Sequence, residues 1–251
     1  MTRIIQVSDT HLGAHLGANN ADALASLEAA AALGADLVVN TGDITANGAD
    51  DRRDLQYARE AHAAFAAPLA FIPGNHDVGE EPNAPAMGQP IDAERIARYR
   101  GVFGPDRWAR DLGAWRLIGL NSLLIGSGLE QEDAQYFWLA NELNDARGRP
   151  VGLFLHKPLW LEHPQDDPEP LWTIDPEKRA RYRKALTGAR FIASGHLHQY
   201  RVRRSDGVLH VWAPSAAFPM RDHDFGGERK IGFLALDLTD EGDVGVDFIR
   251  T

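Results

Sequence analysis

The sequence predicts an α/β fold in which two packed mixed β-sheets are flanked by helices. Strand-like and helix-like segments alternate between Ile4 and Ile72, which is typical of parallel strands joined by crossover helices. After Tyr200 the pattern changes to short strands separated by turn signals, which favours a second set of paired strands. No internal repeat or linker-like stretch is visible, so we expect one domain over residues 1–251.

The N-terminal part predicts the order β-α-β-α-β. Its strands are short apolar runs rich in β-branched residues, and its helices stop before Gly34 and Pro68. The predicted strands are Ile4–Val7, Asp36–Asn40 and Leu69–Ile72, and the predicted helices are Ala21–Leu33 and Asp51–Phe65.

The middle of the chain contains two irregular segments, Gly79–Pro90 and Trp160–Pro176, whose prolines and glycines predict loops. Around them we predict helices at Ile91–Gly101, Glu132–Ala146 and Glu177–Leu186, and strands at Trp115–Asn121, Val151–Leu155 and Phe191–Ala193. The tail adds the predicted strands Tyr200–Arg203, Val208–Trp212, Ile231–Leu238 and Val244–Ile249.

Composition and charge exclude several classes of function. The formal net charge of −10 argues against a long nucleic acid as partner. The chain has no cysteine, so disulfides, thiolate metal sites and a cysteine nucleophile are excluded. We expect a cytoplasmic protein that does not bind membranes, because no signal-peptide pattern precedes the first strand and no apolar run is long enough to cross a bilayer. Assembly into a homo-oligomer stays open. The basic run at 178–184 is predicted as a solvated helix face.

Residues of the types that commonly bind metals, Asp, Asn and His, follow five of the predicted strands. Ligands in open α/β sheets bind outside the carboxyl ends of the strands, so these clusters are expected to converge. Gly42, Gly74 and Gly195 would permit sharp turns or close backbone approach beside them. The clusters are Asp9-Thr10-His11, Gly42-Asp43, Gly74-Asn75-His76-Asp77, His156 and Gly195-His196-Leu197-His198. Their donors are sufficient for two metal ions side by side, an arrangement that predicts hydrolysis at phosphorus.

The pattern of these clusters resembles the calcineurin-like metallophosphoesterase superfamily. That superfamily carries D-x-H, G-D, G-N-H-D/E, a lone H and G-H-x-H in this order, and all five blocks occur here between residues 9 and 198. The resemblance implies a four-layer α-β-β-α sandwich. It implies a first metal bound by Asp9, His11 and His198, a second bound by Asn75, His156 and His196, and Asp43 shared by both. His76 would act on the substrate as the catalytic residue, with Asn75 also near the substrate.

Mixed imidazole and oxygen donors suit Mn, Fe, Zn, Co or Ni as the two divalent ions. The resemblance then implies that a hydroxide bridging the metals attacks phosphorus. His76 would donate a proton or a hydrogen bond to the leaving oxygen.

A second stretch resembles the class III cyclic-nucleotide phosphodiesterase group of the superfamily. It consists of Asn121-Ser122, Gly126-Ser127-Gly128-Leu129, Gln135 and Trp138-Leu139. Packing of a helix face explains Trp138 and Leu139 without any role in catalysis.

The sequence departs from the superfamily pattern at one position. Many members have G-D-x-x-D, whose second Asp supports the catalytic histidine, but here that position is Ala46. We expect Asp77 or another acid to orient His76 in its place, or His76 to work with a lower pKa.

The predicted function is hydrolysis of small phosphodiesters, with cyclic nucleotides among the candidate substrates. Two alternatives stay open: a phosphomonoesterase or other phosphorus-ester hydrolase on the same metals, and a non-catalytic scaffold. Substrate choice is expected from Gly79–Pro90, Trp160–Pro176 and Pro214–Glu228. His223, in the last of these segments, is a candidate substrate contact. His15, His62, His163 and His210 are expected to be ordinary surface or core histidines.

Overall fold

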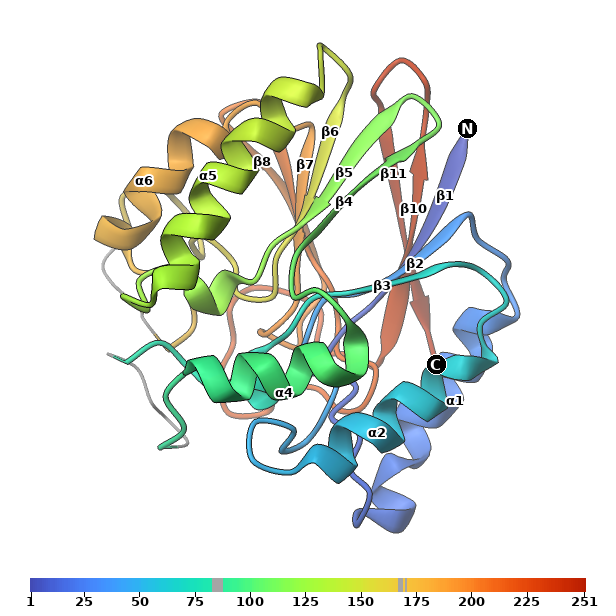
Figure 1. Cartoon of the computed structure of the whole chain (residues 1–251). Coiled ribbons are helices and arrows are strands. Elements are labelled where there is room, and N and C mark those ends of the chain that lie inside the picture. Colours follow the sequence, from blue (N-terminus) through green and yellow to red (C-terminus); the bar gives the residue numbers. More distant parts are fainter. Residues whose placement is uncertain (83–87, 167–168, 170) are drawn as a thin grey trace.

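Two mixed β-sheets pack face to face in the computed structural model, which describes residues 1–82, 88–166, 169 and 171–251. One sheet has the strand order β11-β10-β1-β2-β3, and the other has the order β4-β5-β6-β7-β9-β8. Helices cover the outer face of each sheet (Figure 1). The predicted α/β class with two flanked mixed sheets is therefore confirmed.

The first sheet combines the N-terminal strands with the end of the chain. Strands β1, β2 and β3 are parallel, whereas β10 and β11 are antiparallel to their neighbours. Helices α1, α2 and α4 pack on its outer face. The bounds are β1 (Thr2–Val7), β2 (Leu37–Asn40), β3 (Leu69–Phe71), β10 (Gly232–Leu238), β11 (Val244–Arg250), α1 (Ala21–Ala31), α2 (Arg52–Ala61) and α4 (Ala93–Phe103).

The second sheet contains four parallel strands between two antiparallel edge strands. Strands β5, β6, β7 and β9 are parallel, and β4 and β8 form the edges. Helices α5 and α6 pack on its outer face. The bounds are β4 (Trp108–Leu112), β5 (Trp115–Gly119), β6 (Val151–Phe154), β7 (Phe191–Ser194), β8 (Arg201–Ser205), β9 (Val208–Trp212), α5 (Glu130–Asp145) and α6 (Pro176–Leu186).

Side chains alternate between the two faces of each strand and so build separate apolar layers. In β1, Ile4 faces the core between the sheets, whereas Ile5 and Val7 pack against the helices of the first sheet. Ile118 and Leu153 of the second sheet pack with residues of α5 and α6. The result is the four-layer α-β-β-α sandwich that the resemblance implies.

Two elements were not predicted from the sequence. Strand β4 contains Arg110 and Asp111 and is only partly buried, because it is an edge strand that pairs only with β5. Helix α3 (Asn75–Val78) is a single turn within the Gly-Asn-His-Asp cluster. Three 3₁₀ turns were also unpredicted: η1 (Gly17–Asn20), η2 (His62–Ala64) and η3 (Ser122–Leu124). The predicted helix Asp51–Phe65 ends as α2 at Ala61 and continues as η2.

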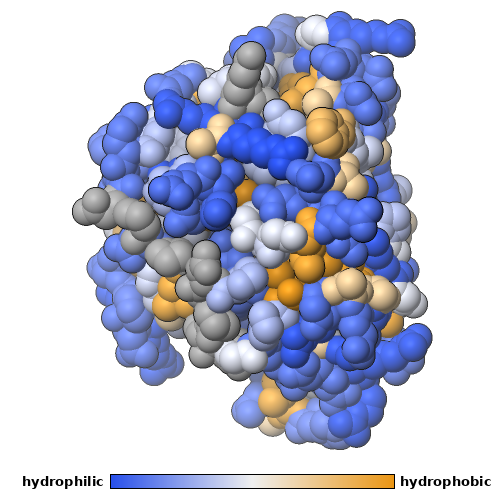
Figure 2. All heavy atoms as spheres, turned by 60° about the vertical axis from the view of Figure 1, so that its left-hand side comes forward, coloured by the Kyte–Doolittle hydropathy of each residue, from blue (hydrophilic) through white to orange (hydrophobic). Residues whose placement is uncertain are grey.

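The surface visible in Figure 2 is mostly hydrophilic, with small hydrophobic patches. Among the described residues, seven large hydrophobic side chains are exposed: Met1, Leu16, Leu24, Leu33, Phe137, Val202 and Phe218. No helix of the described chain combines the length and the apolar character needed to cross a membrane.

Candidate metal centre

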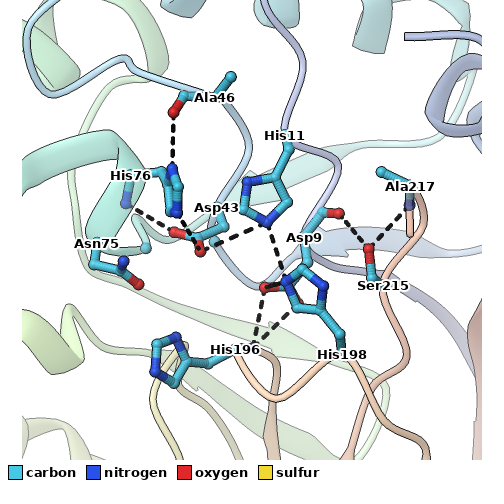
Figure 3. Close-up of polar contacts among 12 residues, drawn as sticks. Asp9, His11, Asp43, Ala46, Asn75, His76, His196, His198, Ser215 and Ala217 are labelled. Atoms are coloured by element: carbon cyan, nitrogen blue, oxygen red, sulfur yellow. Dashed lines mark hydrogen bonds and ion pairs between the residues drawn. The ribbon is translucent and has the colours of Figure 1, made fainter. Parts of the chain in front are cut away.

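The eight candidate site residues come together where the strands of both sheets end. Asp9 and His11 follow β1, and Asp43 follows β2. Asn75 and His76 begin α3 after β3. The second sheet supplies His156 after β6, and His196 and His198 after β7. Figure 3 shows most of these side chains pointing toward one another.

Five of these residues have a left-handed backbone, which non-glycine residues rarely adopt. Seven non-glycine residues of the described chain have a positive φ angle. Five of the seven are Asp9, His11, Asp43, His196 and His198. Strained backbone of this kind tends to occur at functional sites.

Glycines beside the candidate ligands allow the chain segments to approach closely. A Cβ atom at Gly74 would collide with the backbone nitrogen and the carboxylate of Asp43, and one at Gly195 would collide with Ser8 and Asp9. The close-approach role expected for these two glycines is therefore confirmed.

Asp43 lies between two groups of donors. Its Oδ2 is 3.8 Å from His11 Nε2, and its Oδ1 is 3.3 Å from His156 Nε2. On one side, His198 Nε2 lies 3.1 Å from His11 Nε2 and 3.3 Å from Asp9 Oδ1. On the other side, the Oδ1 of Asn75 is 3.2 Å from His156 Nε2. One carboxylate between two donor groups is the arrangement that a pair of metal ions requires.

Backbone carbonyls fix the protonation of four of the imidazole rings. A carbonyl can only accept a hydrogen bond, so the ring nitrogen facing it carries the proton, and the other nitrogen keeps its lone pair in the neutral ring. The pairs are His76 Nδ1 with Ala46 O (2.8 Å), His156 Nδ1 with Thr41 O (2.9 Å), His196 Nε2 with Leu171 O (2.8 Å) and His198 Nδ1 with Phe218 O (2.9 Å). Metal-binding histidines are commonly held in this way.

The second ring nitrogen of His156 lies near the oxygens of Asn75 and Asp43, and that of His198 lies near an oxygen of Asp9. In the neutral ring, His156 Nε2 would present a lone pair to the side-chain oxygen of Asn75, and two lone pairs repel unless a cation lies between them. The same donors form three groups whose ligand atoms lie within 4.8 Å of one another: Asp9, His11 and His198; His11, Asp43 and His76; and Asp43, His156 and His196. This donor set therefore fits metal ions.

The two buried carboxylates keep their negative charge. Burial alone would raise the pKa of Asp43, but His156 and His76 outweigh it and hold the pKa well below the ordinary value. Burial likewise opposes ionisation of Asp9, and His198 reverses the effect so that its pKa is lowered. Burial lowers the pKa of His196 to about 3, which keeps this ring neutral. Burial opposes charge on His156 as well, but Asp43 raises the pKa of this ring to about 9, so a proton on His156 and a metal cation are alternative partners for the carboxylate.

Asp77 does not orient His76, contrary to the expectation from the sequence. The carboxylate of Asp77 accepts hydrogen bonds from the backbone nitrogens of Gly74, Ile44 and Thr45, and also from the Thr45 hydroxyl. Asp77 therefore holds the loop before α3 to the loop after β2. The carbonyl of Ala46 orients His76 instead (Figure 3). A backbone group thus does what a side-chain carboxylate was expected to do.

A cavity of about 350 Å³ opens at the centre of the candidate ligands. Two of the candidate ligands, Asp9 and His156, are fully buried and do not line this cavity. The three segments from which substrate choice was expected all contribute to the lining of this cavity. Trp160–Pro176 contributes Leu171 and Trp172, Pro214–Glu228 contributes Phe218 and Met220, and Gly79–Pro90 contributes Glu80. Residues 83–87 of that last segment lie outside the described residues. The lining residues are His11, Asp43, Asn75, His76, Glu80, Leu171, Trp172, His196, His198, Phe218 and Met220.

His223 is not among these lining residues. Its ring packs against the ring of Trp172, with a distance of 4.6 Å between the ring centroids. Its direct contact with a substrate stays a prediction.

A protein-family model described as Calcineurin-like phosphoesterase matches residues 2–200 of the chain. The chain belongs to the calcineurin-like phosphoesterase family. It is accordingly a metal-dependent phosphoester hydrolase.

Curated relatives of this calcineurin-like phosphoesterase include named phosphodiesterases. The 3′,5′-cyclic adenosine monophosphate phosphodiesterase CpdA of Escherichia coli strain K12 is 30% identical over 239 residues, covering 88% of this chain and 78% of CpdA. CpdA of Pseudomonas aeruginosa is 28% identical, covering 95% and 86%. The glycerophosphodiester phosphodiesterase GpdQ of Enterobacter lignolyticus is 31% identical, covering 66% and 60%.

Solved structures agree with the fold. A dimetal phosphatase from Danio rerio has a TM-score of 0.65 at 14% identity, covering 99% of this chain and 96% of the other. A purple acid phosphatase from yellow lupin has a TM-score of 0.66 at 14% identity, covering 99% and 51%. At this identity the likeness shows the fold alone.

Several contacts that build the centre were not predicted from the sequence. Ser215 Oγ donates to the backbone oxygen of Asp9 at 2.8 Å (Figure 3), and Glu80 accepts from the side-chain amide of Asn75 at 3.2 Å. Ser122 was noted as part of a family pattern; its hydroxyl accepts from the backbone nitrogen of Lys157, directly after His156. These residues carry no spacing signal, because each acts through one local hydrogen bond.

Proposed function

We propose that this calcineurin-like phosphoesterase hydrolyses small phosphodiesters, with 3′,5′-cyclic nucleotides among its substrates, at two metal ions held by the candidate residues. The placement of Asp43 between two groups of oriented donors carries this proposal. The relatives support the diester, since CpdA is named as a cyclic AMP phosphodiesterase and GpdQ as a glycerophosphodiester phosphodiesterase.

We assign Asp43 as the ligand shared by both ions. The first ion takes Asp9, His11 and His198, and the second takes Asn75, His156 and His196. Two of the groups of donor atoms described above support this division: one contains Asp9, His11 and His198, and the other contains Asp43, His156 and His196. Imidazole, carboxylate and amide donors together favour Mn, Fe, Zn, Co or Ni.

The cavity also favours a diester over a monoester. A phosphodiester carries one negative charge, and a monoester carries up to two near neutral pH. None of the described residues that line the cavity is Lys or Arg, and one of them is Glu80. A second negative charge would therefore meet no cationic side chain there.

We assign to His76 the protonation of the leaving group. Bound metals would supply a water of lowered pKa and neutralise charge on the phosphoryl oxygens. The carbonyl of Ala46 holds Nδ1–H, so the ring can donate a second proton only from Nε2, as an imidazolium. Nε2 lies 3.9 Å from the Asp43 carboxylate, so this nitrogen faces the ligand that we assign to both ions. His76 is also the candidate most open to solvent, with its side chain 24% exposed.

Two variants separate metal binding from catalysis. Asp43→Asn is expected to lose most bound metal and activity, because the shared ligand loses its charge. His76→Ala is expected to retain metal while kcat falls by about 10²–10⁴, the usual contribution of a general acid. Metal content is measured by mass spectrometry after dialysis, and turnover with Mn²⁺ added.

The substrates for this test are cyclic AMP, bis(p-nitrophenyl) phosphate and p-nitrophenyl phosphate. Diester turnover that exceeds monoester turnover is expected. Turnover of the monoester alone would contradict the diester assignment, and an active His76→Ala would contradict the role of His76. His15→Ala is the matched control, because His15 is exposed and lies outside the site.

A further inference from the structure

One wall of the cavity is made of apolar side chains that do not serve as candidate metal ligands. Leu171 and Trp172 come from the loop before α6, and Phe218 and Met220 come from the segment after β9. The rest of the lining consists of candidate ligands and Glu80. A phosphoester bound with its phosphorus at the ligands would therefore place an organic group against the apolar wall.

Phe218 is held in place although its side chain is exposed. Its relative exposure is 47%. Its backbone nitrogen donates to Ser215 Oγ at 3.1 Å, and its backbone oxygen accepts from His198 Nδ1 at 2.9 Å. Ser215 in turn bonds the backbone oxygen of Asp9. The backbone of Phe218 is thus fixed by a hydrogen bond to His198 and, through Ser215, by a link to Asp9, whereas its side chain stays exposed.

The ring of Phe218 lies directly beside the candidate metal ligands. Its centroid is 4.9 Å from the ring centroids of both His11 and His198. Phe218 shares the cavity lining with Leu171, Trp172 and Met220, and an apolar patch rimmed by polar groups marks a ligand-binding groove. The nearest partner for this ring is a group attached to the reacting phosphate.

Trp172 is held in place by contacts of both its ring and its backbone. Its ring packs on His223 at 4.6 Å and on Phe225 at 5.1 Å, measured between centroids. Its backbone nitrogen donates to Glu169 O, and the preceding carbonyl, of Leu171, accepts from His196. The ring of Trp172 is therefore held in a fixed position at the cavity. The neighbouring residue, Leu171, is hydrogen-bonded to the candidate ligand His196.

We propose that Phe218 and Trp172 form an aromatic subsite that binds a flat aromatic group of the substrate, such as a nucleobase. The inference rests on the proposed function for the position of the phosphate and adds the class of ester. Rigid aromatic rings bind bases by stacking, without hydrogen bonds that read their identity. The subsite selects aromatic esters over small aliphatic ones and does not distinguish one base strongly from another.

The test measures binding and not turnover, so it is independent of catalysis. AMP and ribose 5-phosphate share the sugar and the phosphate and differ by the base. Calorimetric titration of the Mn²⁺-loaded protein is expected to show AMP binding at least about fivefold more tightly, the weaker end of the range known for stacking of one base on an aromatic ring. In Phe218→Ala this preference is expected to disappear, while the affinity for ribose 5-phosphate is unchanged.

Three variants complete the experiment. Phe218→Tyr should keep the preference, Trp172→Ala should reduce it, and Phe137→Ala, at an exposed phenylalanine of α5, should leave it unchanged. Metal content of Phe218→Ala should equal that of the wild type, because the hydrogen bonds of Phe218 to Ser215 and His198 are made by its backbone.

Equal binding of AMP and ribose 5-phosphate by the wild type would overturn the subsite. So would an unchanged preference in Phe218→Ala, or an equal loss of both affinities. Absence of diester turnover in a protein that still prefers AMP would count against the proposed function and not against the subsite.

Discussion

Glu80 acts on the metal centre through the amide of Asn75. It accepts a hydrogen bond from Asn75 Nδ2, which leaves the amide oxygen facing His156 Nε2. An amide that turns over would present its NH₂ group to the metal, and NH₂ does not bind a cation. The carboxyl of Glu80 therefore selects the orientation in which Asn75 is a ligand.

Glu80→Ala is expected to weaken metal binding by about 10–100-fold, the usual effect of removing a group that orients a ligand. The measurement is metal retained during titration with a competing chelator. Glu60→Ala, at an exposed acid on α2, is the control. Unchanged metal affinity in Glu80→Ala would mean that Asn75 is oriented without it.

The candidate ligands were predictable from the sequence, whereas the groups that orient them were not. Asp, Asn and His in short clusters after strands are chemically distinctive, and the structure gathers all of them. The orienting groups are largely backbone carbonyls, such as those of Ala46, Leu171 and Phe218. Every residue has a carbonyl, so no residue type marks these positions. This is why the carbonyl of Ala46 was not among the groups considered for orienting His76.

At the scale of elements, α6 holds the loop that precedes it. Arg179, predicted to lie on a solvated helix face, is 4% exposed. Its guanidinium donates to the backbone oxygens of Leu159, Pro164 and Ile174. Because the loop also carries Leu171, which binds His196, one arginine links α6 to the metal centre.

Arg179→Ala is expected to destabilise the protein by about 1–3 kcal/mol, because buried carbonyls lose their donor. Hydrogen exchange should rise across residues 159–174 more than elsewhere. Arg183→Ala is the matched control on the same helix, since that side chain is about half exposed. Equal exchange in wild type and Arg179→Ala would show that the loop is held by other contacts.

Strand and helix positions were largely predictable, but strand partners were not. The apolar runs at β1 and β2 identify strands by themselves. That β10 pairs with β1, and that β8 and β9 join the other sheet, depends on contacts between distant parts of the chain. Edge strand β4 was missed because its mixed composition carries little hydrophobic pattern.

For the whole molecule, buried neutral histidines contribute a loss of stability in acid. His62 is fully buried. Its ring nitrogen Nδ1 contacts the backbone oxygen of Ala58, and its Nε2 contacts the side-chain amide of Asn40. Burial lowers its pKa to about 4, from an ordinary value of 6.5. Burial similarly lowers the pKa of His210 to about 4. The unfolded chain binds these protons more readily than the folded chain does.

Stability is therefore expected to fall as the pH drops from about 6.5 toward 4, because protons favour the unfolded state in that window. His62 alone contributes about 2 kcal/mol of this loss at pH 5. Urea unfolding at pH 7 and pH 5 measures it. In His62→Gln the loss between the two pH values should be smaller by about that amount. An identical loss in both proteins would contradict the assignment to His62.

The candidate ligands come from both sheets: they follow three strand ends of the first sheet and two strand ends of the second. If they share metal ions, the ions cross-link the sheets at one edge, and the free energy of metal binding becomes part of the free energy of folding. Metal starvation would then act on the amount of protein as well as on its activity. The apoprotein would open more often at this edge and be degraded sooner by proteases.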